Sequence, residues 1–140
     1  MVVVDVANVM GARADGWWRD RAAAAQRLCL EVIALAGRGD GPADAWVLVL
    51  EGRARDAVPP LEEEDPTLAA DWAPAEGQGP RPVRLVSAPG AGDDAIVGVV
   101  AEVVGRDESC LVVTADRRLR QRCEELNASV VGPGWLLRLL

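Results

Sequence analysis

The sequence predicts a single α/β domain built on a parallel sheet, and two features of its pattern indicate this fold. Five short runs of β-branched and aliphatic residues recur along the 140 residues, and most are separated by segments with helical spacing. The runs are almost continuously apolar, which is typical of strands buried on both faces of a parallel sheet. The length also fits one compact domain. We therefore expect residues 1–140 to form one domain of the α/β class.

The expected elements follow in chain order. Strands are expected at Val2–Val6, Trp46–Leu50, Val83–Val86, Leu111–Thr114 and Ser129–Val131. A helix is expected over Arg19–Ala36, where apolar residues recur four and three positions apart before a glycine. Further helices are expected over Asp94–Val104 and Arg117–Leu126, and a short closing helix over Gly134–Leu140.

One connection is too long for an ordinary loop. The segment Gly52–Pro82 joins the second and third strands, so we expect it to contain structure or to be a functional excursion. Asp65-Pro66-Thr67 predicts a capping residue followed by proline at the first position of a short helix that reaches Trp72. The acid run Glu62–Asp65 is interpreted mainly as a solvated face.

The composition excludes several kinds of chemistry. The chain has no His and no Lys, so all fifteen basic residues are Arg. Catalytic triads with His, His-ligated zinc, Walker lysines and Schiff bases are therefore excluded. The net charge of −7 argues against a broad basic surface for nucleic acid, so any such contact must be local.

Cysteine usage and hydropathy bear on the compartment. Cys29, Cys110 and Cys123 lie far apart in the sequence, and we interpret them as reduced thiols with a packing role. The longest apolar stretches are shorter than the roughly 20 residues that a membrane helix needs. We therefore expect a soluble, cytoplasmic protein without a membrane partner.

Acidic residues follow four of the five predicted strands at the point where each strand ends. They are Asp5, Glu51, the pair Asp93 and Asp94, and Asp116. The carboxyl ends of parallel strands meet at one edge of a sheet, where open α/β sheets bind ligands. Like charges gathered there repel one another unless a cation binds them, and ligation by carboxylates alone favours Mg²⁺ or Mn²⁺. Such ions activate water and stabilise the leaving oxygen in phosphodiester hydrolysis.

Each acid taken singly has a plainer explanation. Asp93 or Asp94 could serve only as a cap for the helix that follows Gly90-Ala91-Gly92, and Asp116 could cap the next helix. The four positions together, at successive strand ends, are what predict a metal site.

Three segments carry motifs in a defined order. They are Val4-Asp5-Val6-Ala7-Asn8-Val9, then Gly92-Asp93-Asp94-Ala95-Ile96-Val97, and then Val113-Thr114-Ala115-Asp116-Arg117. In this order they resemble the NYN group of PIN-like ribonucleases, including its YacP-like branch, over nearly the whole chain. The resemblance implies a three-layer α/β/α PIN-like fold whose central parallel sheet has the order 3-2-1-4-5. It also implies a metal-dependent nuclease that acts on RNA.

The resemblance implies a set of metal ligands, namely Asp5, Glu51, Asp93, Asp94 and Asp116. Asp5, Asp94 and Asp116 would be the catalytic acids, holding Mg²⁺ or Mn²⁺ directly or through water. Asp93 would replace or assist Asp94, because sequence does not show which of two adjacent carboxylates faces the cleft. Glu51 matches an acid that often follows the second strand in that group, although Asp is commoner there.

The same resemblance gives Asn8 the role of orienting Asp5 or of contacting a metal-bound water or a phosphate, and it gives Thr114 a supporting hydrogen bond near Asp116. Arginines follow the first, second and fourth strands and suit phosphate binding. They are Arg13, Arg19, Arg21, Arg53, Arg55, Arg117 and Arg118. Of these, Arg13, Arg19, Arg21 and Arg117 are predicted to bind substrate. About half of the seven are equally well explained by pairing with surface acids.

Trp17 and Trp18 precede the first long helix and could stack bases, or one could close the core while the other shields that helix. The leading hypothesis is a Mg²⁺- or Mn²⁺-dependent ribonuclease acting on single-stranded or structured RNA. The alternatives are a catalytically weak RNA- or protein-binding module of the same fold and a small-molecule phosphohydrolase. A homodimer is compatible with the exposed edge strands and the apolar tail from Trp135 to Leu140.

Overall fold

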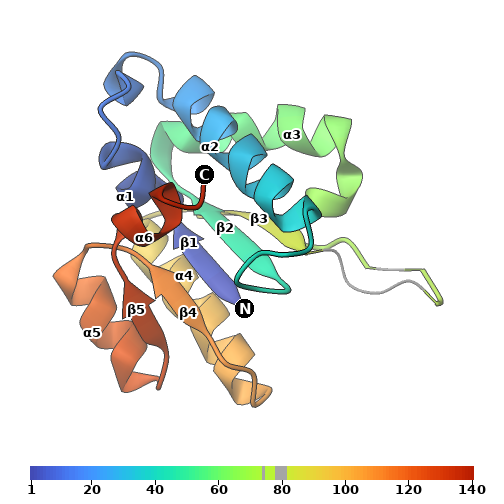
Figure 1. The fold of residues 1–140 in the computed structure, drawn as a ribbon, viewed down its shortest axis with the longest axis vertical. Coiled ribbons are helices and arrows are strands. Elements are labelled where there is room, and N and C mark those ends of the chain that lie inside the picture. The colour runs from blue at the N-terminus through green and yellow to red at the C-terminus, as the bar shows by residue number, and fades with distance from the viewer. Residues whose placement is uncertain (74, 78–81) are drawn as a thin grey trace.

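The computed structural model describes residues 1–73, 75–77 and 82–140, and within them it contains a five-stranded sheet whose strands all run parallel (Figure 1). The strands are β1 (Val2–Asp5), β2 (Trp46–Leu50), β3 (Val83–Ser87), β4 (Leu111–Val113) and β5 (Ser129–Val131). Their spatial order is β3-β2-β1-β4-β5, so β1 lies at the centre. The α/β class and the sheet order 3-2-1-4-5 are therefore confirmed.

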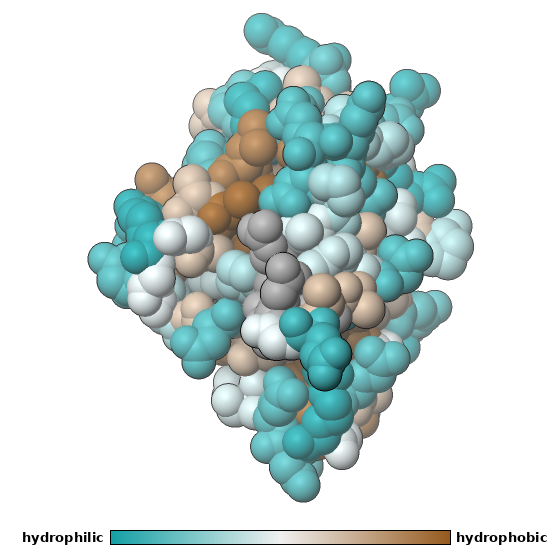
Figure 2. All heavy atoms as spheres, turned by 90° about the vertical axis from the view of Figure 1, so that its right-hand side faces the viewer, coloured by the Kyte–Doolittle hydropathy of each residue, from teal (hydrophilic) through white to brown (hydrophobic). Residues whose placement is uncertain are grey.

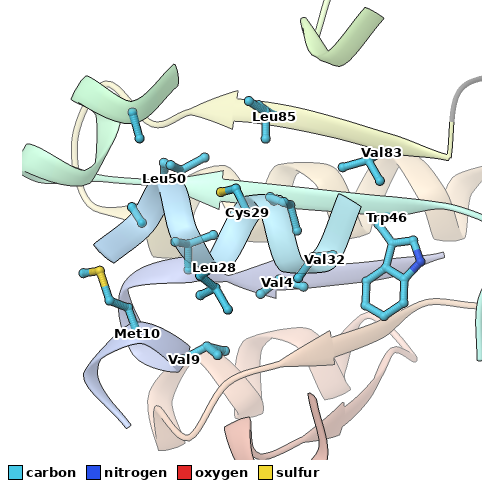
Figure 3. Close-up of a cluster of buried hydrophobic side chains, with 14 of the residues drawn as sticks. Val4, Val9, Met10, Leu28, Cys29, Val32, Trp46, Leu50, Val83 and Leu85 are labelled. Carbon is cyan, nitrogen blue, oxygen red and sulfur yellow. The ribbon is translucent and has the colours of Figure 1, made fainter. Parts of the chain in front are cut away.

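Helices cover both faces of the sheet and complete a three-layer α/β/α arrangement (Figure 1). One layer contains α1 (Val6–Gly11), α2 (Arg21–Gly37), α3 (Val58–Glu64) and α6 (Pro133–Leu137), and the other contains α4 (Gly92–Gly105) and α5 (Arg117–Glu125). Alternate strand residues enter opposite cores: Val4 joins the first and Val3 the second. In the first core, Leu28 and Val32 of α2 lie over the sheet (Figure 3). Burial of such a leucine contributes about 1.5–3 kcal/mol.

The order of the strands creates one switch point. From β1 the chain winds outward through β2 to β3, and it then returns to the other side of β1 for β4 and β5. The connections after β1 and β4 therefore leave the sheet in opposite directions. In open α/β sheets, such a point forms a crevice outside the carboxyl ends of the strands, and ligands bind there.

Two predicted boundaries at the start of the chain were wrong. The first strand ends at Asp5 rather than Val6, because the Asp5 side chain accepts a hydrogen bond from the Asn8 backbone N–H and caps α1, a helix that we did not predict. The helix expected over Arg19–Ala36 begins two residues later than expected and covers Arg21–Gly37. Trp17–Arg19 form a 3₁₀ turn, η1, and α2 begins only after Asp20 caps it by accepting from the Ala23 N–H at 3.0 Å.

The remaining expected elements are present with small shifts at their ends. The third strand extends to Ser87, the fourth stops at Val113, and α4 begins at Gly92, so that the two adjacent acids lie in its first turn. The third long helix ends at Glu125, and the closing helix covers Pro133–Leu137. These differences follow from capping and fraying at element ends.

The long excursion contains more structure than we expected. It begins with η2, a 3₁₀ segment over Gly52–Ala57, continues with α3, and ends its helical part in η3 (Pro66–Leu68). The helix expected to reach Trp72 is only this last turn, and the end of the segment includes residues 74 and 78–81, which lie outside the described residues. Hydrophilic residues dominate the face that carries the excursion, with smaller hydrophobic areas between them (Figure 2).

The C-terminal tail packs within its own chain. The Trp135 ring stacks on Trp46 with centroids 6.5 Å apart, and Leu136 is fully buried. Cys29, Cys110 and Cys123 are free and buried, in keeping with a packing role. Among the described residues, no helix combines the length and the apolar character that crossing a membrane requires.

Candidate functional site

A connected set of hydrogen bonds surrounds Asp5 at the carboxyl ends of β1 and β4. The Thr114 hydroxyl, which is fully buried, donates to Asp5 Oδ2 at 3.0 Å and accepts the Asp116 backbone N–H at 3.2 Å. The Asn8 backbone N–H donates to Asp5 Oδ1 at 3.3 Å. The first and third motifs, more than 100 residues apart in the chain, thus meet at the switch point.

Asp5 is a buried acid, with 7% of its surface exposed. Burial is the main cause that raises the pKa of Asp5 to about 6, because a carboxylate loses its hydration at this position. The hydrogen bonds from Thr114 and Asn8 act in the opposite direction, and the negative charges of Glu51 and Asp93 raise the pKa further. The pKa of Asp5 therefore depends on the charges of two acids that follow other strands.

Asn8 joins the two loops at the crevice. Its side-chain Oδ1 accepts the Ala115 backbone N–H at 2.7 Å, while its own backbone N–H contacts Asp5. Ala115 lies between Thr114 and Asp116, so this bond holds the segment that carries the third motif. Asn8 therefore uses its side-chain oxygen within the protein, and its structural role is to position Thr114 and Asp116 against Asp5.

Glu51 and Asp93 extend the acidic region toward β2 and β3. The Glu51 carboxylate accepts the backbone N–H of Gly92, the first residue of α4. A Cβ at Gly92 would lie 2.9 Å from Glu51 Oε2, so glycine allows this close approach. Partial burial, together with the charges of Asp116 and Glu51, raises the pKa of Asp93 above its usual value. We call Asp5, Glu51, Asp93 and Asp116 the acid cluster.

The structure distinguishes the two adjacent acids of the second motif. Asp93 is partly buried, and its pKa responds to Asp116 and Glu51. Asp94 is exposed, with 83% of its side-chain surface accessible, and it pairs with Arg122 of α5 at 3.0 Å. Of the two possibilities that the sequence left open, Asp93 belongs to the acid cluster and Asp94 lies outside it. The catalytic role that the sequence assigns to Asp94 stays a prediction.

The described residues contain no group of three or more His, Cys, Asp or Glu side chains placed to hold a metal ion. Asp5, Glu51 and Asp116 each accept hydrogen bonds from donors of the chain itself, Asp116 by capping α5 through the Leu119 N–H at 2.9 Å. Each carboxylate nevertheless keeps acceptor positions that these bonds do not use. The donors are oxygen only, and Mg²⁺ commonly takes one or two carboxylates and keeps several waters. The chemistry of the cluster therefore fits Mg²⁺ or Mn²⁺ held partly through water.

The arginines predicted to bind substrate have different surroundings. Arg13 forms a two-pronged ion pair with Glu31, with N···O distances of 3.0 and 2.5 Å, so its guanidinium is engaged within the protein. The Arg21 guanidinium lies 5.4 Å from the centre of the Trp17 ring, and that of Arg19 lies 5.8 Å from the Trp18 ring. Arg117 is exposed at the first position of α5, beside Asp116.

The sequence did not indicate the contact of Gly92 with Glu51. It did place Arg53 among the arginines suited to phosphate, although not among those predicted to bind substrate, and in the structure Arg53, at the start of η2, lines a hollow together with Arg21 and Glu51. Arg53 comes two residues after Glu51, the acid that follows β2. Its proximity to Arg21 depends on how η2 packs against α2, which local spacing does not reveal.

Comparisons of the chain with protein-family models, with curated proteins and with solved structures gave no match.

Asn8→Ala is expected to lower kcat for the reaction of this site by about 10-fold or more, with KM nearly unchanged, because the loop that carries Thr114 and Asp116 loses its anchor. The lost hydrogen bond should also cost about 0.5–1.5 kcal/mol of stability. Asn8→Asp retains an oxygen that accepts from Ala115 and should keep more of kcat than Asn8→Ala. Steady-state kinetics and thermal unfolding of the three proteins test this role, and equal kcat values for Asn8→Ala and the wild type would contradict it.

Proposed function

We propose that this protein is a ribonuclease that hydrolyses RNA phosphodiester bonds with the help of Mg²⁺ or Mn²⁺. The observation that carries the proposal is the grouping of four acids from four strand ends around the switch point of a parallel sheet. The resemblance of three segments to the NYN group of PIN-like ribonucleases supports it. The proposal implies the cytoplasm as the compartment, where RNA and reduced thiols coexist.

In this proposal the acids would bind the ion, and Thr114 would orient one of them. Asp5, Asp93 and Asp116 would hold the ion, and Glu51 would contribute from the end of β2. When bound, the ion supplies a more acidic water and polarises the phosphate. Thr114 fixes the orientation of Asp5 through its hydroxyl, and burial of this pair excludes water from one side of the crevice.

The acid cluster by itself repels RNA, because its charges have the same sign as the phosphates. A divalent ion would offset part of this negative charge, and nearby arginines offer guanidinium groups to phosphate oxygens. This explains how a chain of net charge −7 can act on a polyanion through a small region.

The direct test measures cleavage of fluorescent single-stranded and structured RNAs in Mn²⁺, in Mg²⁺ and in EDTA. The wild type should cleave only with metal, and Asp116→Asn should lower the rate by at least about 100-fold, because several kcal/mol of charge stabilisation are lost. Asparagine caps helices as well as aspartate, so this variant should fold like the wild type. The parallel purification of the variant also exposes contaminating nuclease.

Thermal unfolding supplies a control that does not depend on the substrate. Metal that binds the native state at about 100 times its dissociation constant should stabilise the wild type by about 2.7 kcal/mol and Asp116→Asn by much less. Cleavage that survives in Asp116→Asn would overturn the proposal. Metal binding without RNA cleavage would instead favour a binding module, or a small-molecule phosphohydrolase if small phosphates are hydrolysed.

A further inference from the structure

Two adjoining hollows lie beside the acid cluster, between the start of α2 and η2. The first, of about 380 Å³, is lined by Trp17 and Glu51 among others, and the second, of about 620 Å³, by Trp18 and Arg19 among others. Both include Arg21, Gly52 and Arg53 in their lining. We call the pair the Trp–Arg groove. Because Glu51 also belongs to the acid cluster, the groove leads from Trp18 to the proposed reaction site.

The ion pairs of the described residues leave out the arginines of the groove. Ion pairs engage Arg13, Arg27, Arg106, Arg120 and Arg122 elsewhere in the protein. By contrast, Arg19, Arg21 and Arg53 form no ion pair with any residue that the structure describes. Among the described residues, other arginines also form no ion pair, so the distinguishing feature of these three is that they line one pair of adjoining hollows. Their shared position offers several guanidinium donors to an anion at one place.

Three carboxylates also line the groove, namely Asp20 and Asp56 in the larger hollow and Glu51 in the smaller one. The groove is therefore close to neutral in formal charge, and phosphate binding there depends on where the guanidinium groups lie rather than on a net positive charge. The Arg21 and Arg19 guanidinium groups lie over the Trp17 and Trp18 rings, respectively. A guanidinium packed on a ring can still donate its N–H groups to phosphate oxygens.

Trp18 supplies an aromatic surface next to these cations. Its side chain is 59% exposed, whereas Trp17 is partly buried and packs against the core. The two rings meet edge to face with centroids 6.1 Å apart. An exposed indole beside arginines is the arrangement with which proteins bind single-stranded nucleic acid, since any unpaired base has a face to stack. Bases inside a duplex are already stacked on one another and are not available in this way.

We propose that the Trp–Arg groove binds single-stranded RNA, with an unpaired base stacked on Trp18 and the adjoining phosphates held by Arg21 and Arg53. The groove then directs the strand past Glu51 to the acid cluster. This inference rests on the proposed function, because it names the form of RNA that the same site takes and the residues that select it.

The test separates binding from cleavage. Fluorescence anisotropy measures the affinity of the full chain in EDTA for a labelled single-stranded RNA of roughly 12 nucleotides and for a duplex of equal length. The single strand should bind more tightly. Trp18→Ala should weaken its binding by about 5- to 100-fold, the range for loss of one base stack. Arg53→Ala should weaken binding and lower the dependence of log K on log salt by about 0.7, the value for one lost phosphate contact to a single strand.

Matched control variants exist at the other end of the molecule. Trp72 lines neither hollow of the groove. Arg106 pairs with Glu108 and lines a separate hollow together with Met1 and Trp46. Trp72→Ala and Arg106→Ala should therefore bind single-stranded RNA as the wild type does. Thermal unfolding confirms that all four variants are folded before their affinities are compared.

The outcomes distinguish this inference from the proposed function. Three results would overturn the proposed role of the groove. They are unchanged binding in Trp18→Ala and Arg53→Ala, tighter binding of the duplex than of the single strand, and no binding of single-stranded RNA by the wild type. The proposed function would survive the first two results if Asp116 remained essential for cleavage. Conversely, a groove that binds as expected in a protein that never cleaves RNA with metal would support the groove and overturn the ribonuclease.

Discussion

Asp5→Asn is expected to abolish metal-dependent cleavage and, in the same protein, to raise the stability of the metal-free fold at neutral pH. The loss of cleavage should be at least about 100-fold, because the central acid of the cluster loses its charge. The gain in stability has a different origin. Burial raises the pKa of Asp5 from 3.8 to about 6, so the charged form costs free energy in the folded state. A shift of about 2 units corresponds to an upper limit of about 3 kcal/mol.

The pH dependence of this gain follows from the direction of the shift. The folded state binds a proton at Asp5 more tightly than the unfolded state does, so the contribution of Asp5 to stability falls as pH rises from about 4 to about 6. Below that window the acid is protonated in both states, and Asp5→Asn should match the wild type. Above it the variant should keep its full advantage.

Thermal unfolding in EDTA at several pH values measures this difference. Asp116→Asn is the matched control, because it removes an acid of the same cluster but keeps a capping side chain on α5. It should lose cleavage without a comparable gain in stability. If Asp5→Asn were instead less stable than the wild type at pH 7, the role of Asp5 would be to hold the crevice together.

The second large effect concerns the two adjacent acids of α4. Asp93→Asn should lower kcat/KM for RNA by at least about 100-fold, whereas Asp94→Asn should change it by only a few-fold. Asp93 shares the cluster with Asp116 and Glu51, while Asp94 faces solvent and contacts Arg122. Loss of that exposed ion pair should cost less than about 1 kcal/mol of stability.

Cleavage assays with the two variants at saturating metal test this assignment. The pair is well matched, because the same substitution is made at neighbouring positions in the first turn of one helix. A large loss in Asp94→Asn combined with normal cleavage by Asp93→Asn would show that the helix turns its other acid to the substrate when metal binds.

Both predictions reflect a conflict between stability and function. A buried acid surrounded by other acids weakens the fold, and a sequence selected only for stability would not place Asp5 there. The hydrogen bonds from Thr114 and Asn8 offset part of this cost. The same bonds orient the carboxylate toward the crevice.

Much of the architecture was predictable from local patterns. The apolar runs Trp46–Leu50 and Ser129–Val131 became strands with the expected bounds. The first is buried throughout, as its continuous apolar character indicates, whereas the second is an edge strand and is only partly buried. The acids that follow the strands could be placed at one edge of the sheet, because the carboxyl ends of parallel strands lie at the same edge. We did not predict α1, because its valines are β-branched and resemble a continuation of the strand. The local sequence does not reveal that Asp5 caps a helix there.

The sequence by itself determined the fold class, the oxygen-only chemistry available to the site and the strand ends from which its acids come. Only the tertiary structure decided that Asp93 rather than Asp94 joins the cluster, that Asn8 binds Ala115, that Arg13 is engaged by Glu31, and that Arg53 lies with Arg21 in one groove. The physical reason is the range of the interactions. Periodicity and capping act over a few residues, whereas the rotation of a helix on the sheet and the pairing of distant side chains depend on packing across the whole domain.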